Sequence, residues 1–237
     1  MVPISLPFLS KNLIQMQYFL IFEKNKNMSL IDALKWRYAT KKFDDKKIIS
    51  DNYINQIKQG FNLSASSYGL QPVTLLLIHN KNIQKQLVQL SMNQNQVADA
   101  SHLAVFCVKT KIDSNYVKEY FERVKTIRKV KDSIIDPFRS HIINSFDKKS
   151  IEDITLWSTK QAYLAMGNLL AVCADLKIDA CPMEGFDPDE YDNFFNLKSK
   201  NLKSVLIMPM GYRSEDDVFS TMQKVRKPLN LSVVDII

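Results

Sequence analysis

The sequence predicts an α+β domain in which helices surround one small β-sheet. Short runs of β-branched residues and leucine, typical of buried strands, recur along the chain, and longer amphipathic segments separate them. A length of 237 residues with 46% hydrophobic side chains also suffices for one large core. An α/β arrangement of the same elements is the alternative that this pattern leaves open.

The first half of the chain predicts three helices and two strands. Ser29 and Ser50 precede amphipathic runs and are of the residue type that caps helices. The second of these helices has one apolar face, formed by Tyr53, Ile54, Ile57 and Phe61. The other expected elements are a loop over 64–72, strands over 73–78 and 103–108, and a helix over 83–92.

Helices dominate the second half. Residues 113–149 are charged and amphipathic, and we expect Pro137 to break them. The most apolar helix follows over 151–176, where Gly167 marks a point at which another backbone could approach closely. The remaining elements are a strand end entering a tight loop over 178–186, a strand over 202–210, and a tail over 228–237 that is compatible with an extended arm.

Residues 28–237 form one predicted domain, because no internal repeat or linker interrupts them. Residues 1–27 differ from the rest: they lack the basic start and the small-residue cleavage site of a signal peptide. Met28 directly precedes the first helix cap. We therefore expect Met28 to be the natural start and residues 1–27 to be an extension outside the core.

Composition excludes several classes of protein. No two of the five glycines lie within five positions of each other, so neither the dinucleotide-binding G-x-G-x-x-G motif nor the G-x-x-x-x-G-K phosphate loop can occur. A bound phosphate would have to be held by side chains. The longest apolar runs are too short for a membrane span, so we expect no membrane partner.

The formal net charge is +7, which has two interpretations. The basic residues are scattered, and aromatic residues do not alternate with them as a base-stacking surface requires. We therefore expect one basic pocket for a small ligand and no nucleic-acid partner, with a nucleic-acid-binding domain as the rival interpretation.

Cysteine and histidine usage indicates a cytoplasmic protein without a metal site. The cysteines have no C-x-x-C spacing and lie in apolar surroundings, which predicts buried, reduced thiols at Cys107, Cys173 and Cys181. The histidines are too dispersed for a zinc motif, at His79, His102 and His141.

Two basic pairs and one loop are candidates for a common ligand site. Arg37 and Lys41 follow the first predicted helix, and Lys224 and Arg226 lie near the end of the chain. The loop over 182–185 lies between them in sequence and offers backbone amides to a ligand. Together these features suggest a site for an anion attached to a heterocycle.

At these positions the sequence resembles the nitroreductase family of FMN-dependent NAD(P)H oxidoreductases, in particular its oxygen-insensitive bacterial branch. The matching motifs occur in family order and span about residues 29–230. They are Arg37-Tyr-Ala-Thr-Lys41-Lys-Phe-Asp, Ser66-Ser67 with Gln71-Pro72, Asn93 with Asp99-Ala-Ser-His102, Lys160-Gln-Ala-Tyr163 with Gly167-Asn168, Pro182-Met-Glu184-Gly185-Phe186, and Lys224-x-Arg226-x-Pro228.

The resemblance implies a homodimer with a small central mixed sheet and two FMN sites at the subunit interface, each lined by both chains. Arg37, Lys224 and Arg226 would hold the ribityl phosphate, as forked guanidinium donors suit phosphate oxygens. Lys41 would lie beside the flavin N1–O2 edge, where a cation stabilises the charge that develops on hydride uptake.

The same resemblance assigns the rest of the cofactor site. Asn93 would bond the pyrimidine edge, and Ser66 would approach from the partner subunit. The backbone of Glu184 and Gly185 would lie near N5. Tyr38, Ala39, Thr40 and Gln96 complete the implied cofactor-binding set. No side chain receives a catalytic role, because the flavin carries the chemistry while Lys41 and the Glu184 backbone tune it.

Two residues depart from the family pattern. Ala39 stands where many relatives have serine, which removes one hydroxyl near the phosphate. Gln96 stands where well-known members have lysine, so the reduced flavin has one cation fewer nearby and we expect a lower flavin potential. Tyr68 and Ile143 are the candidate substrate contacts. Tyr68 would form an aromatic wall for the substrate or serve in ordinary packing.

The implied reaction is a ping-pong, two-electron reduction of nitroaromatics or quinones through flavin N5, with NADH or NADPH as electron donor. No short pyridine-nucleotide motif favours either donor. Two alternatives remain: a dihydropteridine reductase with the same flavin, and a flavin-binding protein without turnover.

Overall fold

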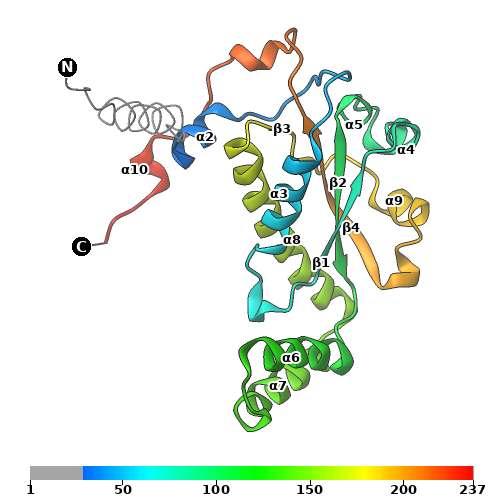
Figure 1. The fold of residues 1–237 in the computed structure, drawn as a ribbon, viewed down its shortest axis with the longest axis vertical. Helices are drawn as coiled ribbons and strands as arrows, with labels where there is room; N and C mark the ends of the chain where they lie inside the picture. The colour runs from blue at the N-terminus through cyan, green and yellow to red at the C-terminus, as the bar shows by residue number, and fades with distance from the viewer. Residues whose placement is uncertain (1–28, 237) are drawn as a thin grey trace, which may run out of the picture.

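The sheet contains four strands in the order β1-β2-β4-β3 (Figure 1). Their bounds are Val73–Ile78 (β1), His102–Lys109 (β2), Asp179–Ala180 (β3) and Leu202–Gly211 (β4). Each neighbouring pair is antiparallel, and the parallel component is an isolated bridge between Ala39 and Ala180. The computed structural model describes residues 29–236. The predicted extension 1–27 and the expected start at Met28 lie outside the described residues.

Strand β2 is the centre of the core, because its two faces pack against different helices. Ala104, Phe106 and Val108 face α3 (Asp51–Asn62) and α8 (Ile151–Asp175). The alternate residues, Leu103, Val105 and Cys107, pack with α4 (Lys81–Leu87), α5 (Gln96–Asp99) and α9 (Pro188–Phe194). A strand covered on both faces needs a continuous apolar run, which explains why this segment was predictable from its residues alone. Figure 1 shows the two helical layers on opposite sides of the sheet.

The helix starts agree with the predicted caps. The Ser29 hydroxyl accepts from the amide of Asp32 at the start of α2 (Leu30–Trp36), and the Ser50 hydroxyl accepts from the amide of Tyr53 in α3. The 25-residue α8 begins with a reciprocal capping box between Ser150 and Asp153. These bonds satisfy amides that have no partner within their own helix.

The predicted break at Pro137 is wrong. Pro137 lies inside α7 (Asp132–Phe146), and the chain instead turns between α6 (Ser114–Arg128) and α7, where Lys129 adopts φ 53°. In its second-turn position the proline removes one helical hydrogen bond, whereas the left-handed backbone at Lys129 ends α6 outright. Apolar residues of the two helices form their own cluster with Leu70 and Ile154.

Three other expectations need adjustment. The helix expected over 83–92 is divided into α4 and a 3₁₀ turn over Gln89–Ser91, after which Met92 and Asn93 adopt positive φ. A Cβ placed on Gly167 would meet no atom within 4 Å, so no backbone in the described part of the chain approaches it closely. The tail contains a short helix, α10 (Leu229–Ser232), with exposed residues on either side.

The three cysteines are free and buried, as predicted. Among residues 29–236 there is no group of three or more acidic, histidine or cysteine side chains placed to hold a metal ion. None of the helices described is both long enough and apolar enough to cross a membrane.

His102 makes folding stability sensitive to acid. Its side chain is 7% exposed, and burial, reinforced by the nearby His79 and Lys81, lowers its pKa to about 4. An unfolded histidine titrates near pH 6.5, so the unfolded chain binds the proton more tightly. This contribution to stability is therefore complete above about pH 6.5 and declines as the pH falls towards 4.

Because of His102, we expect the free energy of unfolding to fall by about 1–2 kcal/mol when the pH is lowered from 7 to 5. Urea unfolding of the wild type and His102→Gln at both pH values measures this, because glutamine does not titrate there. An identical pH dependence in the two proteins would contradict the prediction.

Candidate functional site

The segment 37–41 is held against the sheet edge by a buried acid, Asp179. Its carboxylate is 4% exposed at the side chain and accepts from the Arg213 amide (2.8 Å), from Arg213 Nε (2.9 Å) and from Arg213 Nη2 (2.6 Å). Thr40 Oγ1 also donates to it at 3.4 Å. The Arg213 guanidinium lies 4.3 Å from the Trp36 ring centre and 4.6 Å from that of Tyr38. The Asp179–Arg213 ion pair thus connects β3 and the end of β4 to Trp36 and Tyr38, the residues before and after Arg37.

A second acid, Asp217, lies on the other side of the segment. It accepts from the Tyr38 hydroxyl (2.9 Å) and from the backbone amides of Lys41 (3.0 Å) and Lys42 (3.1 Å). It also accepts from the amide of Phe219 at 3.0 Å, at the start of a 3₁₀ turn over Val218–Thr221. The segment 37–42 is therefore bonded to the segment that leads towards the C-terminus.

The structure brings the two predicted basic pairs together, although 187 positions separate Arg37 from Lys224. Lys224 Nζ donates to the backbone oxygen of Arg37. A pocket of about 350 Å³ lies between the two segments and is lined by Arg37, Tyr38, Ala39, Lys41, Phe219, Met222, Gln223, Lys224, Val225 and Arg226. We call Arg37, Lys41, Lys224 and Arg226 the cation cluster.

The cation cluster carries positive charge that no acid neutralises. Over residues 29–236, none of its four side chains forms an ion pair. Burial, and then the charge of Arg226, lowers the pKa of Arg37. Burial followed by the charges of Arg37 and Arg226 likewise lowers the pKa of Lys224. A bound anion would relieve this repulsion, which makes the pocket suited to a phosphate.

The loop over 182–185 begins beside Lys41. Lys41 Nζ donates to Cys181 Sγ at 3.7 Å, and burial of this thiol raises its pKa although Lys41 and Arg37 oppose the shift. The backbone amide of Met183 donates a hydrogen bond to the backbone oxygen of Ile207. In the described chain the amides of Glu184 and Gly185 donate no hydrogen bond, so they are available to a ligand.

Two glutamines hold the far end of this loop. Gln94 Nε2 donates to the backbone oxygen of Gly185 at 2.8 Å, and Gln96 Nε2 donates to Gln94 Oε1 at 3.0 Å. Gln96 is buried and also contacts Met183 Sδ at 3.8 Å. Met92 packs beside Gly185, and the next residue, Asn93, is exposed; its predicted contact with the flavin stays a prediction.

A second hollow, of about 460 Å³, lies between α8 and the loop. Its lining is mostly apolar and consists of Tyr163, Met166, Gly167, Leu170, Pro182, Met183, Glu184 and Leu206. The Tyr163 hydroxyl donates to Glu184 Oε1 at 2.6 Å, and this bond is the main reason that the pKa of Tyr163 is raised. The hollow gives a flat apolar group a place next to the free amides of the loop.

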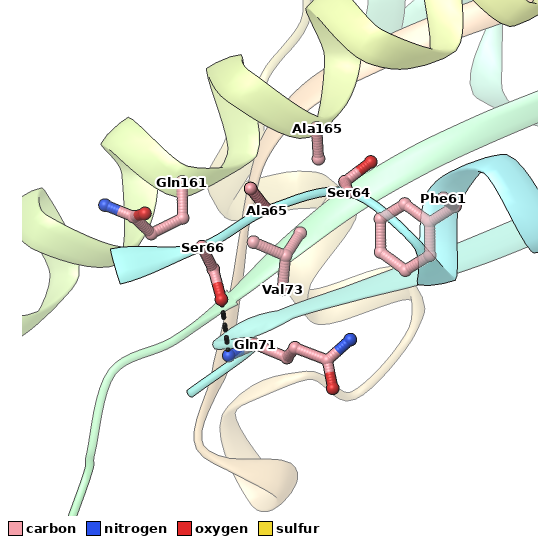
Figure 2. Close-up of a pocket in the computed structure, with 8 residues that line it drawn as sticks. All are labelled: Phe61, Ser64, Ala65, Ser66, Gln71, Val73, Gln161 and Ala165. Carbon is pink, nitrogen blue, oxygen red and sulfur yellow. Dashed lines mark hydrogen bonds between the residues drawn. The ribbon is translucent and has the colours of Figure 1, made fainter. Parts of the chain in front are cut away.

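Ser66 lies apart from the cation cluster in the same chain. It lines a cavity of about 30 Å³ between α3, β1 and α8 (Figure 2). Its hydroxyl accepts from the amide of Gln71 at 2.9 Å, and the neighbouring amide of Ser67 donates to Gln161 at 2.8 Å (Figure 2 shows the Ser66 bond). The predicted cofactor contact of Ser66 therefore depends on a second subunit.

The other predicted residues have mainly packing contacts. Thr40 is fully buried beneath Asp179. The Tyr68 ring stacks on Trp157 with centres 6.3 Å apart and meets Phe138 and Phe146 edge to face, while 42% of the residue stays exposed. Ile143 is partly buried in the cluster of α6 and α7.

Four residues that position this site were not predicted from the sequence: Asp179, Arg213, Asp217 and Gln94. Asp217 had a usable signal, since an aspartate directly before a short turn is a typical helix cap. The roles of Asp179 and Arg213 depend on a contact across 34 positions and had no local signal. Gln94 also had none.

The comparisons with known proteins agree with this geometry. A family model described as the nitroreductase family matches residues 34–212. The oxygen-insensitive NAD(P)H nitroreductase of Salmonella typhimurium is 28% identical over 221 residues, which cover 88% of this chain and all of that protein. The enzyme of the same name from Enterobacter cloacae is 27% identical over the same shares of the two chains.

Solved structures share the fold at lower identity. A nitroreductase-like protein of Streptococcus mutans matches with a TM-score of 0.74 and 22% identity, over 87% of this chain and 97% of its own. A protein of Exiguobacterium sibiricum, classed with the nitroreductases and solved in complex with FMN, matches with a TM-score of 0.75 and 19% identity, over 88% and 98% of the two chains. The match of the family model over most of the chain, on the fold described above, shows that this protein belongs to the nitroreductase family.

Proposed function

We propose that the protein is an FMN-dependent NAD(P)H oxidoreductase that reduces nitroaromatics or quinones. The observation that carries the proposal is the unneutralised cation cluster, which leads through Lys41 to a loop with two free amides. The names of the Salmonella and Enterobacter relatives support the activity, and the FMN complex of the Exiguobacterium protein supports the cofactor.

The residues fit FMN at both of its ends. Arg37, Lys224 and Arg226 offer charged donors to a phosphate dianion in a chain whose glycines form no phosphate loop. Lys41, the fourth member of the cation cluster, contacts Cys181 at the start of the loop, where its charge would stabilise the reduced N1–O2 edge. The amides of Glu184 and Gly185 would meet the ring near N5. Held by these residues, FMN would supply two-electron hydride chemistry between NADH or NADPH and the acceptor.

We also propose a lower flavin potential than in relatives with lysine at the position of Gln96. The buried amide of Gln96 contributes hydrogen bonds to Gln94 and Met183 but no positive charge. Reduction places negative charge on the flavin, and each cation missing nearby makes that form less stable. Ala39 lines the pocket without a hydroxyl for the phosphate.

We propose a homodimer with FMN at the interface, and with ping-pong kinetics because donor and acceptor share one flavin face. Exposed apolar side chains support the dimer: α8 carries Leu156, Tyr163 and Leu164, and the tail carries Leu229 and Leu231. A second chain on this surface would bring Ser66 to the cofactor. Tyr68 and Ile143 remain predicted substrate contacts, and the buried free thiols fit a cytoplasmic location.

Replacing Gly167 with alanine tests the dimer. In an isolated chain we expect the substitution to stabilise α8 by about 1 kcal/mol, since alanine favours helix and no atom lies within 4 Å of the new Cβ. In a dimer packed on this face it should instead weaken association. Sedimentation and urea unfolding at several concentrations measure both effects.

Gly60→Ala is the matched control, because its Cβ would lie 2.9 Å from Val172 Cγ2 within the same chain. It should lower stability at every protein concentration. A monomeric wild type, or a Gly167→Ala protein that is stabilised and associates normally, would contradict the proposed dimer interface.

One spectroscopic experiment tests the function. The purified protein should be yellow with bound FMN, and its absorbance should bleach under anaerobic conditions when NADH or NADPH is added. Adding a nitroaromatic, a quinone or a quinonoid dihydropteridine then shows which acceptor restores the colour. FMN that neither nucleotide reduces would favour a flavin-binding protein without turnover, and absence of flavin binding would refute the proposal.

A further inference from the structure

Asp217 is a buried carboxylate whose oxygens are fully engaged by donors from two distant segments. It is 3% exposed. One oxygen accepts from the Tyr38 hydroxyl and from the amides of Lys41 and Lys42, and the other accepts from the amide of Phe219. Tyr38 and Asp217 are 179 positions apart. No other carboxylate among residues 29–236 receives hydrogen bonds from both segments that line the phosphate pocket.

The charge of Asp217 is used for holding the backbone and not for neutralising the cation cluster. Its carboxylate forms no ion pair with Arg37, Lys41, Lys224 or Arg226. Burial works to raise its pKa, but the bonds from the amides of Lys42, Lys41 and Phe219 outweigh burial and lower it. The group therefore remains an anion at neutral pH and keeps all four donors.

The cation cluster needs such an attachment. Arg37, Lys224 and Arg226 are like charges close together: burial is the main cause of the lowered pKa values of Arg37 and Lys224, and repulsion from Arg226 adds to it in both. The segment 222–226 is exposed and forms no helix or strand, and Lys224 Nζ donates a hydrogen bond to the backbone oxygen of Arg37 in the first segment. Without a bond beneath the pocket, repulsion would separate Lys224 and Arg226 from Arg37.

We propose that Asp217 is a positioning residue that holds the two segments of the cation cluster at the spacing needed to bind the phosphate of the cofactor. The proposal rests on the proposed FMN function. A positioning role and a purely electrostatic role predict opposite changes in phosphate affinity when Asp217 is replaced. Removing a negative charge near a phosphate should strengthen binding by Coulomb attraction, whereas loss of positioning should weaken it.

Asp217→Asn tests this with two ligands, FMN and riboflavin, which lacks the phosphate. Asparagine offers one acceptor oxygen, so an NH₂ group must face at least one of the four donors. We expect the Kd of FMN to rise about tenfold or more, as for loss of one charge-assisted hydrogen bond, and the Kd of riboflavin to change less than about twofold. Fluorescence titration of the purified apoprotein measures both.

Asp216→Asn is the matched control. Asp216 is the adjacent acid, and it is exposed and pairs with Lys42 and Ser214 away from the pocket. It makes the same change in net charge, and we expect the FMN-to-riboflavin affinity ratio to stay at the wild-type value. If Asp217→Asn does not fold, Tyr38→Phe removes one of the four donors and should still lower that ratio about threefold.

Three results would overturn the proposal: an unchanged or tighter FMN Kd in Asp217→Asn, an equal loss of FMN and riboflavin affinity, or the same effect in Asp216→Asn. For Tyr38→Phe, an unchanged ratio would overturn it. Failure of the wild type to bind FMN is a separate result, which would refute the proposed function and this inference together.

Discussion

Replacing both Lys224 and Arg226 with alanine should weaken FMN binding by about 100-fold or more. Charge-assisted hydrogen bonds of this kind contribute about 1.5–3 kcal/mol each, and about 1.4 kcal/mol corresponds to a factor of ten. Both side chains line the pocket beside Arg37, and within residues 29–236 neither pairs with an acid whose charge the substitution would leave unpaired. Flavin fluorescence titration of the apoprotein measures the change.

Lys227→Ala is the control for this double variant, because Lys227 is the next residue, is exposed and does not line the pocket. It should bind FMN like the wild type. The double variant should also unfold at the wild-type urea concentration, since the removed side chains lie at the surface. Unchanged FMN affinity in the double variant would refute the assignment of the phosphate to this pocket.

Asp179→Ala is expected to lower the free energy of unfolding by about 3 kcal/mol. The substitution leaves the Arg213 guanidinium, the Arg213 amide and the Thr40 hydroxyl without their acceptor in a buried place. Removing one partner of a buried ion pair costs about 3–5 kcal/mol, and the partly exposed Arg213 places this case at the lower end. Urea unfolding at neutral pH measures the loss.

Asp189→Ala provides the comparison, because Asp189 forms an exposed ion pair with Lys203 at 3.6 Å. Exposed pairs of this type contribute little to stability. Equal losses in the two variants would show that Asp179 acts only through surface charge and that its four hydrogen bonds do not anchor the segment 37–41.

The strands could be predicted because the signal, a run of β-branched residues and leucine, lies within the strand itself. The segment 73–78 is a β-branched and leucine run, and the structure places β1 over the same residues. Helix starts were also accessible, since Ser50 and Ser150 cap through local bonds. The boundary at Lys129 was not accessible, because nothing in the residue type of a lysine demands a positive φ. The conspicuous Pro137 lies in the second turn of α7, which continues through it with the loss of one helical hydrogen bond.

The candidate site was predictable where family motifs mark it and unpredictable where distant contacts build it. Arg37, Lys41, Lys224 and Arg226 stand in recognisable motifs and do meet in one pocket. The acids that arrange them, Asp179 and Asp217, act across long separations in sequence. Gln94 contributes through a hydrogen bond from its side-chain amide to the backbone oxygen of Gly185, which forms only when the loop is folded.

The joining of two remote segments in one pocket also bears on how the protein is made. Arg37 and Lys224 are 187 positions apart, so the pocket forms only after the chain has been synthesised beyond Lys224. The sheet and its helical layers, complete by Gly211, are synthesised before the pocket closes. A cofactor bound there joins the last part of the chain to the first and adds stability in proportion to the logarithm of its concentration.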